Sequence, residues 1–123
     1  MRADLVGICL AVTPGEACYI PIAHRAGEGE GLFDTGELAA GQLPMAEVLD
    51  ILKPVFEDPS ILKIGQNMKY DAKILARYGI EVAPIDDTML ISYAQHTGEH
   101  GHGMDTLSDR YLGHAPIPIK DLL

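Results

Sequence analysis

Cysteine is scarce in this sequence, which has only Cys9 and Cys18 among its 123 residues. Two cysteines are too few for a disulfide framework, and without partners at metal-ligand spacing they predict no zinc site. Hydrophobic runs are short, since none approaches the roughly 18 apolar residues of a membrane-spanning helix. The start, from Met1 to Leu10, lacks the basic residues and cleavage site of a secretory signal. These absences predict a soluble, cytoplasmic protein without a membrane partner, whose two cysteines are reduced, buried thiols.

Basic residues are also scarce: the chain has 9 Lys and Arg against 18 Asp and Glu, so its net charge is −9. An acidic chain argues against nucleic-acid binding, since contacts to phosphates favour a basic surface. The charge is uneven, however: residues 1–60 hold three basic and ten acidic residues, whereas residues 61–123 hold six and eight. The stretch from Lys63 to Arg77 contains four basic residues and a single acid, Asp71. Composition alone leaves two interpretations of this stretch open, a surface for a phosphate backbone and a solvated helix face.

Short apolar stretches between turn residues predict alternating strands and helices. Residues 5–12 and 17–22 are expected to form a β-hairpin, and residues 45–56 an amphipathic helix whose last turn Pro54 kinks or loosens. Two further strands are expected, at residues 61–64 and 80–85. Three further helices are expected, at residues 67–78, from Asp86 or Asp87 to Tyr93, and at residues 105–112. An extended tail is expected around Pro116 and Pro118. With 47% hydrophobic residues, this order predicts one α/β domain over residues 1–123, built on a mixed sheet.

The stretch from Lys63 to Asp71 carries the side chains best suited to chemistry. A strand ends at Gly65, and Asn67 is a good N-cap for the helix that follows. Because Asn67, Tyr70 and Asp71 lie at positions i, i+3 and i+4, they share one helix face. The amide can bond a phosphate or sugar, the phenol can position a water, and the carboxylate can bind a hard divalent metal. An acid in a first helical turn also complements the helix dipole, so the residues alone leave a structural role for Asp71 open.

Five strings in this order resemble the proofreading 3′→5′ exonuclease domain of bacterial family A DNA polymerases, the polymerase I type. They are Asp4-Leu5-Val6-Gly7, Tyr19-Ile20-Pro21-Ile22-Ala23-His24, Gly65-Gln66-Asn67-Met68-Lys69-Tyr70-Asp71, Asp87-Thr88-Met89-Leu90 and Met104-Asp105-Thr106-Leu107. Leu52-Lys53-Pro54 and the run from Ile74 to Ile80, on either side of the third string, extend the match. The resemblance covers nearly the whole chain, and the third string is similar to the family's second exonuclease motif.

The resemblance implies a ribonuclease H-like fold, a mixed sheet flanked by helices, and hydrolysis of a single-stranded DNA 3′ end during replication and repair. In that family, four acidic residues hold two Mg²⁺ or Mn²⁺ ions. Asp71 matches a metal ligand, and Tyr70 stands beside it as a second catalytic residue. The residues expected to bind DNA are Gln66, Asn67, Lys69, Tyr70 and Arg110.

The resemblance also predicts an incomplete site. The family's first motif, Asp-x-Glu, precedes the hairpin, and its third, Tyr-x-x-x-Asp, lies beyond the tail; neither string occurs in these 123 residues. Glu28 and Glu30 have the spacing of the first motif, but a glycine-rich loop does not fix ligand geometry. We therefore expect a partial exonuclease domain, truncated at both ends, with one of four metal ligands. Such a chain is expected to be inactive alone and to aggregate or swap domains, because its partner is the rest of the polymerase.

Two other functions compete with this interpretation. One is a degenerate exonuclease domain that serves only as a scaffold or DNA-binding domain of a family A polymerase. The other is a fragment of an exoribonuclease of the ribonuclease D type. Separately, His96, His100 and His102 lie close together with Glu99 between them. A Gly- and His-rich stretch of this kind is more often a plain loop than a metal site.

Overall fold

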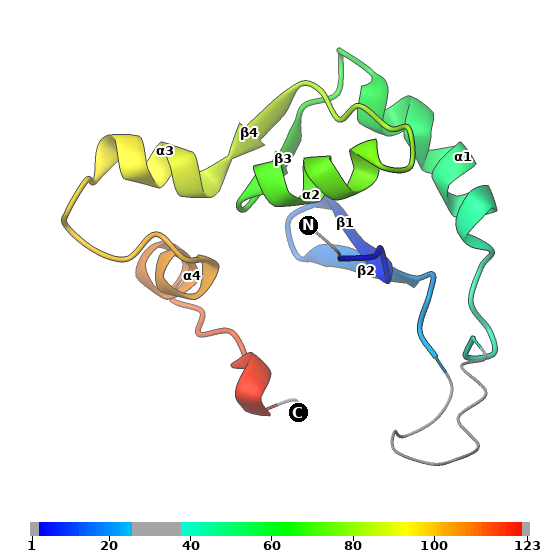
Figure 1. Cartoon of the computed structure of the whole chain (residues 1–123). Coiled ribbons are helices and arrows are strands. Elements are labelled where there is room, and N and C mark those ends of the chain that lie inside the picture. The colour runs from blue at the N-terminus through cyan, green and yellow to red at the C-terminus, as the bar shows by residue number, and fades with distance from the viewer. Residues whose placement is uncertain (1–2, 26–37, 122–123) are drawn as a thin grey trace.

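The computed structural model describes residues 3–25 and 38–121. Glu28 and Glu30 lie outside the described residues. The strands are β1 (Gly7–Thr13), β2 (Glu16–Pro21), β3 (Lys63–Gly65) and β4 (Ile85–Asp87). The helices are α1 (Met45–Glu57), α2 (Met68–Ala76), α3 (Thr88–Gln95), α4 (Met104–Leu112) and a 3-10 turn, η1 (Ile119–Asp121). Figure 1 shows the hairpin, α1 and α2 gathered together, with α3 and α4 extending to one side.

The predicted hairpin is confirmed, with β1 and β2 antiparallel and Gly15 at a φ of 83° in the turn. Glycine adopts this left-handed conformation without the steric cost that other residues carry. The prediction that Cys9 and Cys18 are buried is wrong, because both are exposed. Cys9 alternates with Ile8, which faces the core, and Cys18 lies in the turn half of the hairpin, where the residues are exposed.

One hydrophobic cluster joins the hairpin to α1, α2 and the segment before β4. Its buried members are Ile8, Ile22, Val48, Phe56, Leu75, Ile80 and Val82. The apolar stripe predicted for residues 45–56 is confirmed except at Val55, which is exposed: Val48 and Phe56 are buried and Leu52 packs against the cluster. The helix passes through Pro54 and ends at Glu57. This cluster is what holds α2 in place.

The strand expected at residues 80–85 forms three residues at Ile85–Asp87 instead, parallel to β3. Ile80 and Val82 fill the core rather than a sheet, with 1% and 9% of their surfaces exposed. Pro84 has no backbone N–H to donate, but its carbonyl accepts the Lys63 N–H at 3.0 Å, and the paired strand begins at the next residue, Ile85. The order β3–α2–β4 is a small βαβ unit, in which α2 connects the two parallel strands.

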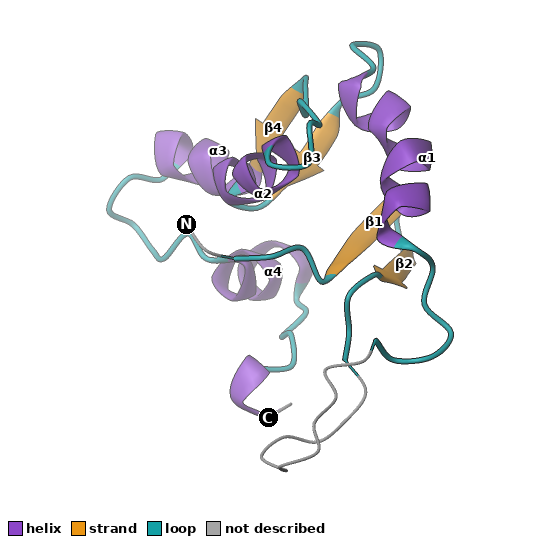
Figure 2. Cartoon of the chain, turned by 45° about the vertical axis from the view of Figure 1, so that its right-hand side comes forward, coloured by secondary structure: helices purple, strands orange, loops and turns teal. Residues whose placement is uncertain are grey.

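The strands form two separate two-stranded sheets rather than the single mixed sheet that we expected. Within residues 3–25 and 38–121, β1 pairs only with β2 and β3 only with β4, as Figure 2 shows. Each of β3 and β4 has three residues, and all of them pair within this second sheet. The fold is therefore α/β with four helices and small sheets.

The C-terminal part of the chain packs least. Helix α4 has no buried residue. The tail, which was expected to be extended, has no helix or strand over residues 114–118 and then forms the 3-10 turn η1. No helix in the described part of the chain has the length and hydrophobicity to cross a membrane.

Candidate active site

Asp87 joins the starts of two helices through one buried carboxylate, of which 8% is exposed. Its Oδ1 accepts hydrogen bonds from the backbone N–H groups of Met89 at 2.9 Å and Asn67 at 3.0 Å. Its Oδ2 accepts one from Met68 N–H at 2.9 Å. The first N–H groups of a helix have no partner inside the helix, so this carboxylate satisfies them for α2 and α3 together. The sequence left Asp86 and Asp87 open at the start of α3, and it did not predict that Asp87 also serves α2.

The prediction that Asn67 caps α2 with its own side chain is wrong. Asn67 is at the N-cap position, but it has φ 56° and ψ 42° and makes no side-chain cap bond. Asp87 instead accepts hydrogen bonds from the N–H groups of Asn67 and Met68, at the very start of α2. Asparagine tolerates this left-handed backbone better than most residues, which explains the residue type at this turn. The amide of Asn67 is therefore exposed and not used as a cap.

Asn67, Tyr70 and Asp71 lie in the first turn of α2, as the spacing predicted. The Tyr70 N–H donates to the Asn67 carbonyl at 2.9 Å, which closes this turn. All three residues are exposed, Tyr70 at 40%. At this turn the structure places an amide, a phenol and a carboxylate together at the surface.

The Asp71 carboxyl has a raised pKa. The main cause is partial burial, which removes water from the charged form, and the negative charge of Asp87 adds to it. Both causes disfavour a negative charge at Asp71 when no cation is near. A cation bound beside Asp71 would favour the charged form and so oppose both causes.

Residues 1–122 match a family model described as 3′-5′ exonuclease. The chain belongs to this exonuclease family. It is 48% identical over 131 aligned positions to DNA polymerase I of Rhizobium leguminosarum, an alignment that takes in 99% of the chain. It is 40% identical to DNA polymerase I of Pseudomonas aeruginosa over 98% of the chain, and 31% identical to that of Chloroflexus aurantiacus over 100%. The chain spans 13%, 12% and 12% of the length of these relatives. The resemblance to the exonuclease domain of DNA polymerase I is confirmed.

Gln66 uses its side chain inside the fold. Its Nε2 donates to the His102 carbonyl at 2.8 Å, and its Oε1 accepts a hydrogen bond from the Thr88 hydroxyl. These bonds tie the end of β3 to the start of α3 and to the segment before α4. A DNA contact by Gln66 stays a prediction, and the structure shows that its amide also positions neighbouring elements.

The basic stretch from Lys63 to Arg77 is only partly available to a phosphate backbone. Lys63 Nζ donates to the carbonyls of Ala83 at 2.6 Å and Asp58 at 2.9 Å. Arg77 pairs with Asp4 at 3.3 Å and also donates to a backbone carbonyl, that of Ala3. Lys69 and Lys73 are exposed on α2, and no ion pair within the described ranges involves either. They are the cations of this stretch best placed to meet a phosphate.

Arg110, the remaining residue predicted to bind DNA, lies on α4. Its guanidinium carbon is 6.0 Å from the centre of the Tyr111 ring, within range of a cation–π contact. In the part of the chain that the structure describes, no hydrogen bond or ion pair links Arg110 to Asn67, Tyr70 or Asp71. The structure therefore does not bring Arg110 into the group at the start of α2.

Asp71 fits one ligand of the metal site that the exonuclease family implies. Its exposed carboxylate suits a hard divalent cation, which prefers oxygen ligands. Both Asp87 oxygens accept backbone N–H bonds, so Asp87 cannot turn to a metal without uncapping two helices. Within residues 3–25 and 38–121, Asp71 belongs to no group of three or more clustered metal-binding side chains. The described residues thus supply one ligand and not a complete two-metal site.

The raised pKa of Asp71 leads to a test of stability. Because the folded state disfavours the Asp71 charge, ionisation there costs stability at pH values above the raised pKa, and this cost disappears as the pH falls towards 3.8, the ordinary value. Asp71→Asn should therefore raise the melting temperature at pH 7. The corresponding gain in the free energy of unfolding should not exceed about 0.5 kcal/mol, because the site is exposed. The gain should shrink as the pH is lowered. Thermal melts from pH 7 to pH 4 measure it, with the exposed helix residue Asp50→Asn as the control. An equal gain in both variants at every pH would contradict the assignment.

Proposed function

We propose that this chain is part of the proofreading 3′→5′ exonuclease domain of a DNA polymerase I, which hydrolyses the 3′ end of single-stranded DNA during replication and repair. The observation that carries the proposal is the exposed first turn of α2, where Asp71, with its raised pKa, stands beside Asn67 and Tyr70. Family membership supports the reaction class. The turn supports a role for these side chains because it presents them together at the surface.

In this proposal each side chain has a distinct task. Asp71 holds one of two Mg²⁺ or Mn²⁺ ions, which when bound activate a water and stabilise the leaving oxygen. The Tyr70 phenol orients the attacking water, and the Asn67 amide bonds the sugar or phosphate of the terminal nucleotide. Gln66, Lys69 and Arg110 line the path of the single strand, with the two cations near its phosphates.

The exposed apolar side chains indicate a partner, and in this proposal that partner is the rest of a polymerase chain. On α3 and α4 these side chains are Leu90, Ile91, Tyr93, Met104, Tyr111 and Leu112. In the ribonuclease H-like fold that we propose, a further strand lies between the two strand pairs and makes one mixed sheet. The chain on its own leaves those strand edges and apolar faces uncovered, which favours aggregated or domain-swapped oligomers.

The two competing functions fare differently. The three relatives compared above are all named DNA polymerase I, which favours the polymerase over a ribonuclease D type of exoribonuclease. A scaffold without catalysis makes the opposite prediction about activity, so an assay separates it from the proposal.

The assay compares the isolated 123-residue chain with a DNA polymerase I chain that carries this sequence. Each is incubated with a 5′-labelled single-stranded oligonucleotide and Mn²⁺, and the products are resolved on a gel. We expect stepwise 3′ trimming by the polymerase and none by the isolated chain, because a single carboxylate binds these ions weakly. Trimming by the isolated chain would refute the incomplete site. A polymerase that does not trim would establish the scaffold instead.

A further inference from the structure

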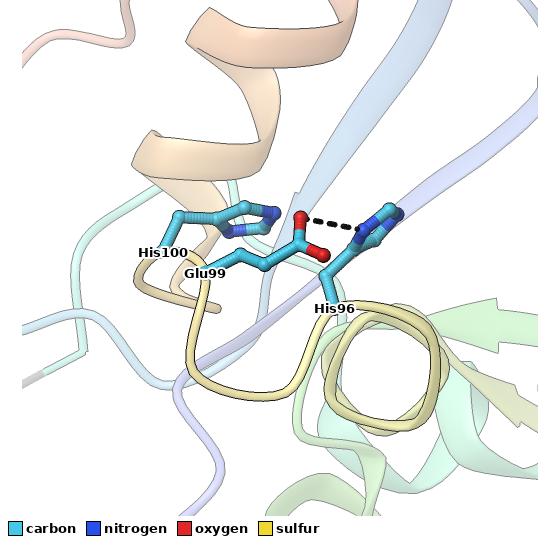
Figure 3. A group of neighbouring side chains, drawn as sticks. All are labelled: His96, Glu99 and His100. Atoms are coloured by element: carbon cyan, nitrogen blue, oxygen red, sulfur yellow. Dashed lines mark hydrogen bonds and ion pairs between the residues drawn. The ribbon is translucent and has the colours of Figure 1, made fainter.

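Three potential metal ligands converge where α3 ends, at the opposite end of that helix from Asp87. One ligand atom each from His96, Glu99 and His100 can be chosen so that all three lie within 4.8 Å of one another. The His96 Nδ1 and Glu99 Oε2 atoms are 3.1 Å apart. Figure 3 shows the Glu99 carboxylate between the two imidazole rings. Because α3 has eight residues, this group lies about 12 Å along the helix from the Asp87 cap.

The backbone holds these ligands close together. His96 is the C-cap residue of α3, and its N–H donates to the Ser92 carbonyl. The Glu99 N–H donates back to the His96 carbonyl at 3.2 Å. Gly98, between them, has a φ of 79°, a conformation that favours glycine. The turn therefore returns Glu99 and His100 to the side of His96.

His100 has one ring nitrogen engaged and one without a partner. Its Nδ1 is 2.7 Å from the Gly101 carbonyl oxygen, which can only accept, so the proton of a neutral ring resides on Nδ1. The lone pair is then on Nε2, and this atom is buried without a hydrogen-bond partner among the described residues. A buried polar atom without a partner is costly. Metal-ligating histidines use this same arrangement, with the far nitrogen bonded to a carbonyl or carboxylate.

We propose that His96, Glu99 and His100 bind a transition-metal ion of the Zn²⁺ class. Two imidazoles and one carboxylate suit Zn²⁺, whereas Mg²⁺ and Ca²⁺ prefer oxygen ligands. The site is separate from Asp71 and selects a different kind of ion. The ring of His100 lies 5.1 Å from that of His102 and 6.2 Å from that of Tyr111 on α4, so a metal here would join the end of α3 to the segment that leads into α4.

The test is a titration of the tag-free, chelator-treated chain with Zn²⁺ by calorimetry, and with Co²⁺ by visible absorption. We expect one ion per chain and the absorption bands of Co²⁺ bound by nitrogen and oxygen. His96→Gln and His100→Gln should each weaken binding at least tenfold, whereas His114→Gln, an exposed histidine outside the group, should leave it unchanged.

Absence of binding, or equal affinity in the three variants, would overturn the proposal. Circular dichroism checks that each variant keeps its helices. If the isolated chain proves unfolded, the same titrations on a DNA polymerase I chain carrying this sequence decide the question. There the His96→Gln and His100→Gln variants should each lose one equivalent of bound ion relative to His114→Gln.

Discussion

Replacing Asp87 with alanine should lower the free energy of unfolding by roughly 1–4 kcal/mol, because loss of a single N-cap side chain costs about 0.5–2 kcal/mol and Asp87 caps two helices. The substitution leaves the N–H groups of Asn67, Met68 and Met89 without their common acceptor. Only 8% of the Asp87 surface is exposed, so water has little access to these N–H groups and cannot fully replace the lost acceptor. Urea unfolding followed by circular dichroism measures the loss.

Asp86→Ala is the matched control, because Asp86 is an exposed acid in the same strand. It should change stability by no more than about 0.5 kcal/mol, the usual range for a surface position. Asp87→Asn keeps one side-chain oxygen as an acceptor and should fall between the two. Hydrogen exchange gives a sharper readout, since the Asn67, Met68 and Met89 amides should lose protection together. Asp87→Ala and Asp86→Ala variants of equal stability would show that the carboxylate is not the joint between the helices.

The second large effect concerns activity. In a DNA polymerase I chain carrying this sequence, Asp71→Ala should slow 3′ trimming of single-stranded DNA by about 10²–10³-fold, because a metal ion contributes several kcal/mol to the transition state. DNA synthesis by the polymerase domain should be unchanged. Trimming rates and primer extension by the same preparation measure the two activities.

Asp71→Ala also separates chemistry from folding. Since the folded state disfavours the charge of Asp71, its removal should not destabilise the protein. A slower reaction in a variant that melts no lower than the parent therefore reports a lost ligand. Asp50→Ala, which removes an exposed acid from α1, serves as the control and should trim normally. Normal trimming by the Asp71→Ala variant would remove Asp71 from the site.

Several features of the site could not be predicted from local patterns. Gln66 and His102 are 36 residues apart in the sequence, and Asp87 is 20 residues from Asn67. Lys63 and Arg77 belong to the basic stretch by sequence, yet both bond within the chain. The Gly- and His-rich stretch is a loop, as expected, but its sequence did not show that His96, Glu99 and His100 come together.

The sequence by itself determined the features that depend on neighbours within about four residues. These are the β-hairpin, the apolar stripe of α1, the start of α3 at Asp86 or Asp87 and the shared turn of Asn67, Tyr70 and Asp71. Turn conformations, helical spacing and caps are short-range interactions, so the residue order specifies them directly. Only the tertiary structure decided which acid caps α2, which cations remain exposed and where β4 begins. Those outcomes depend on how distant elements pack, because a polar side chain such as the Asp87 carboxylate or the half-buried Lys63 bonds to whichever partner the fold brings within hydrogen-bonding distance.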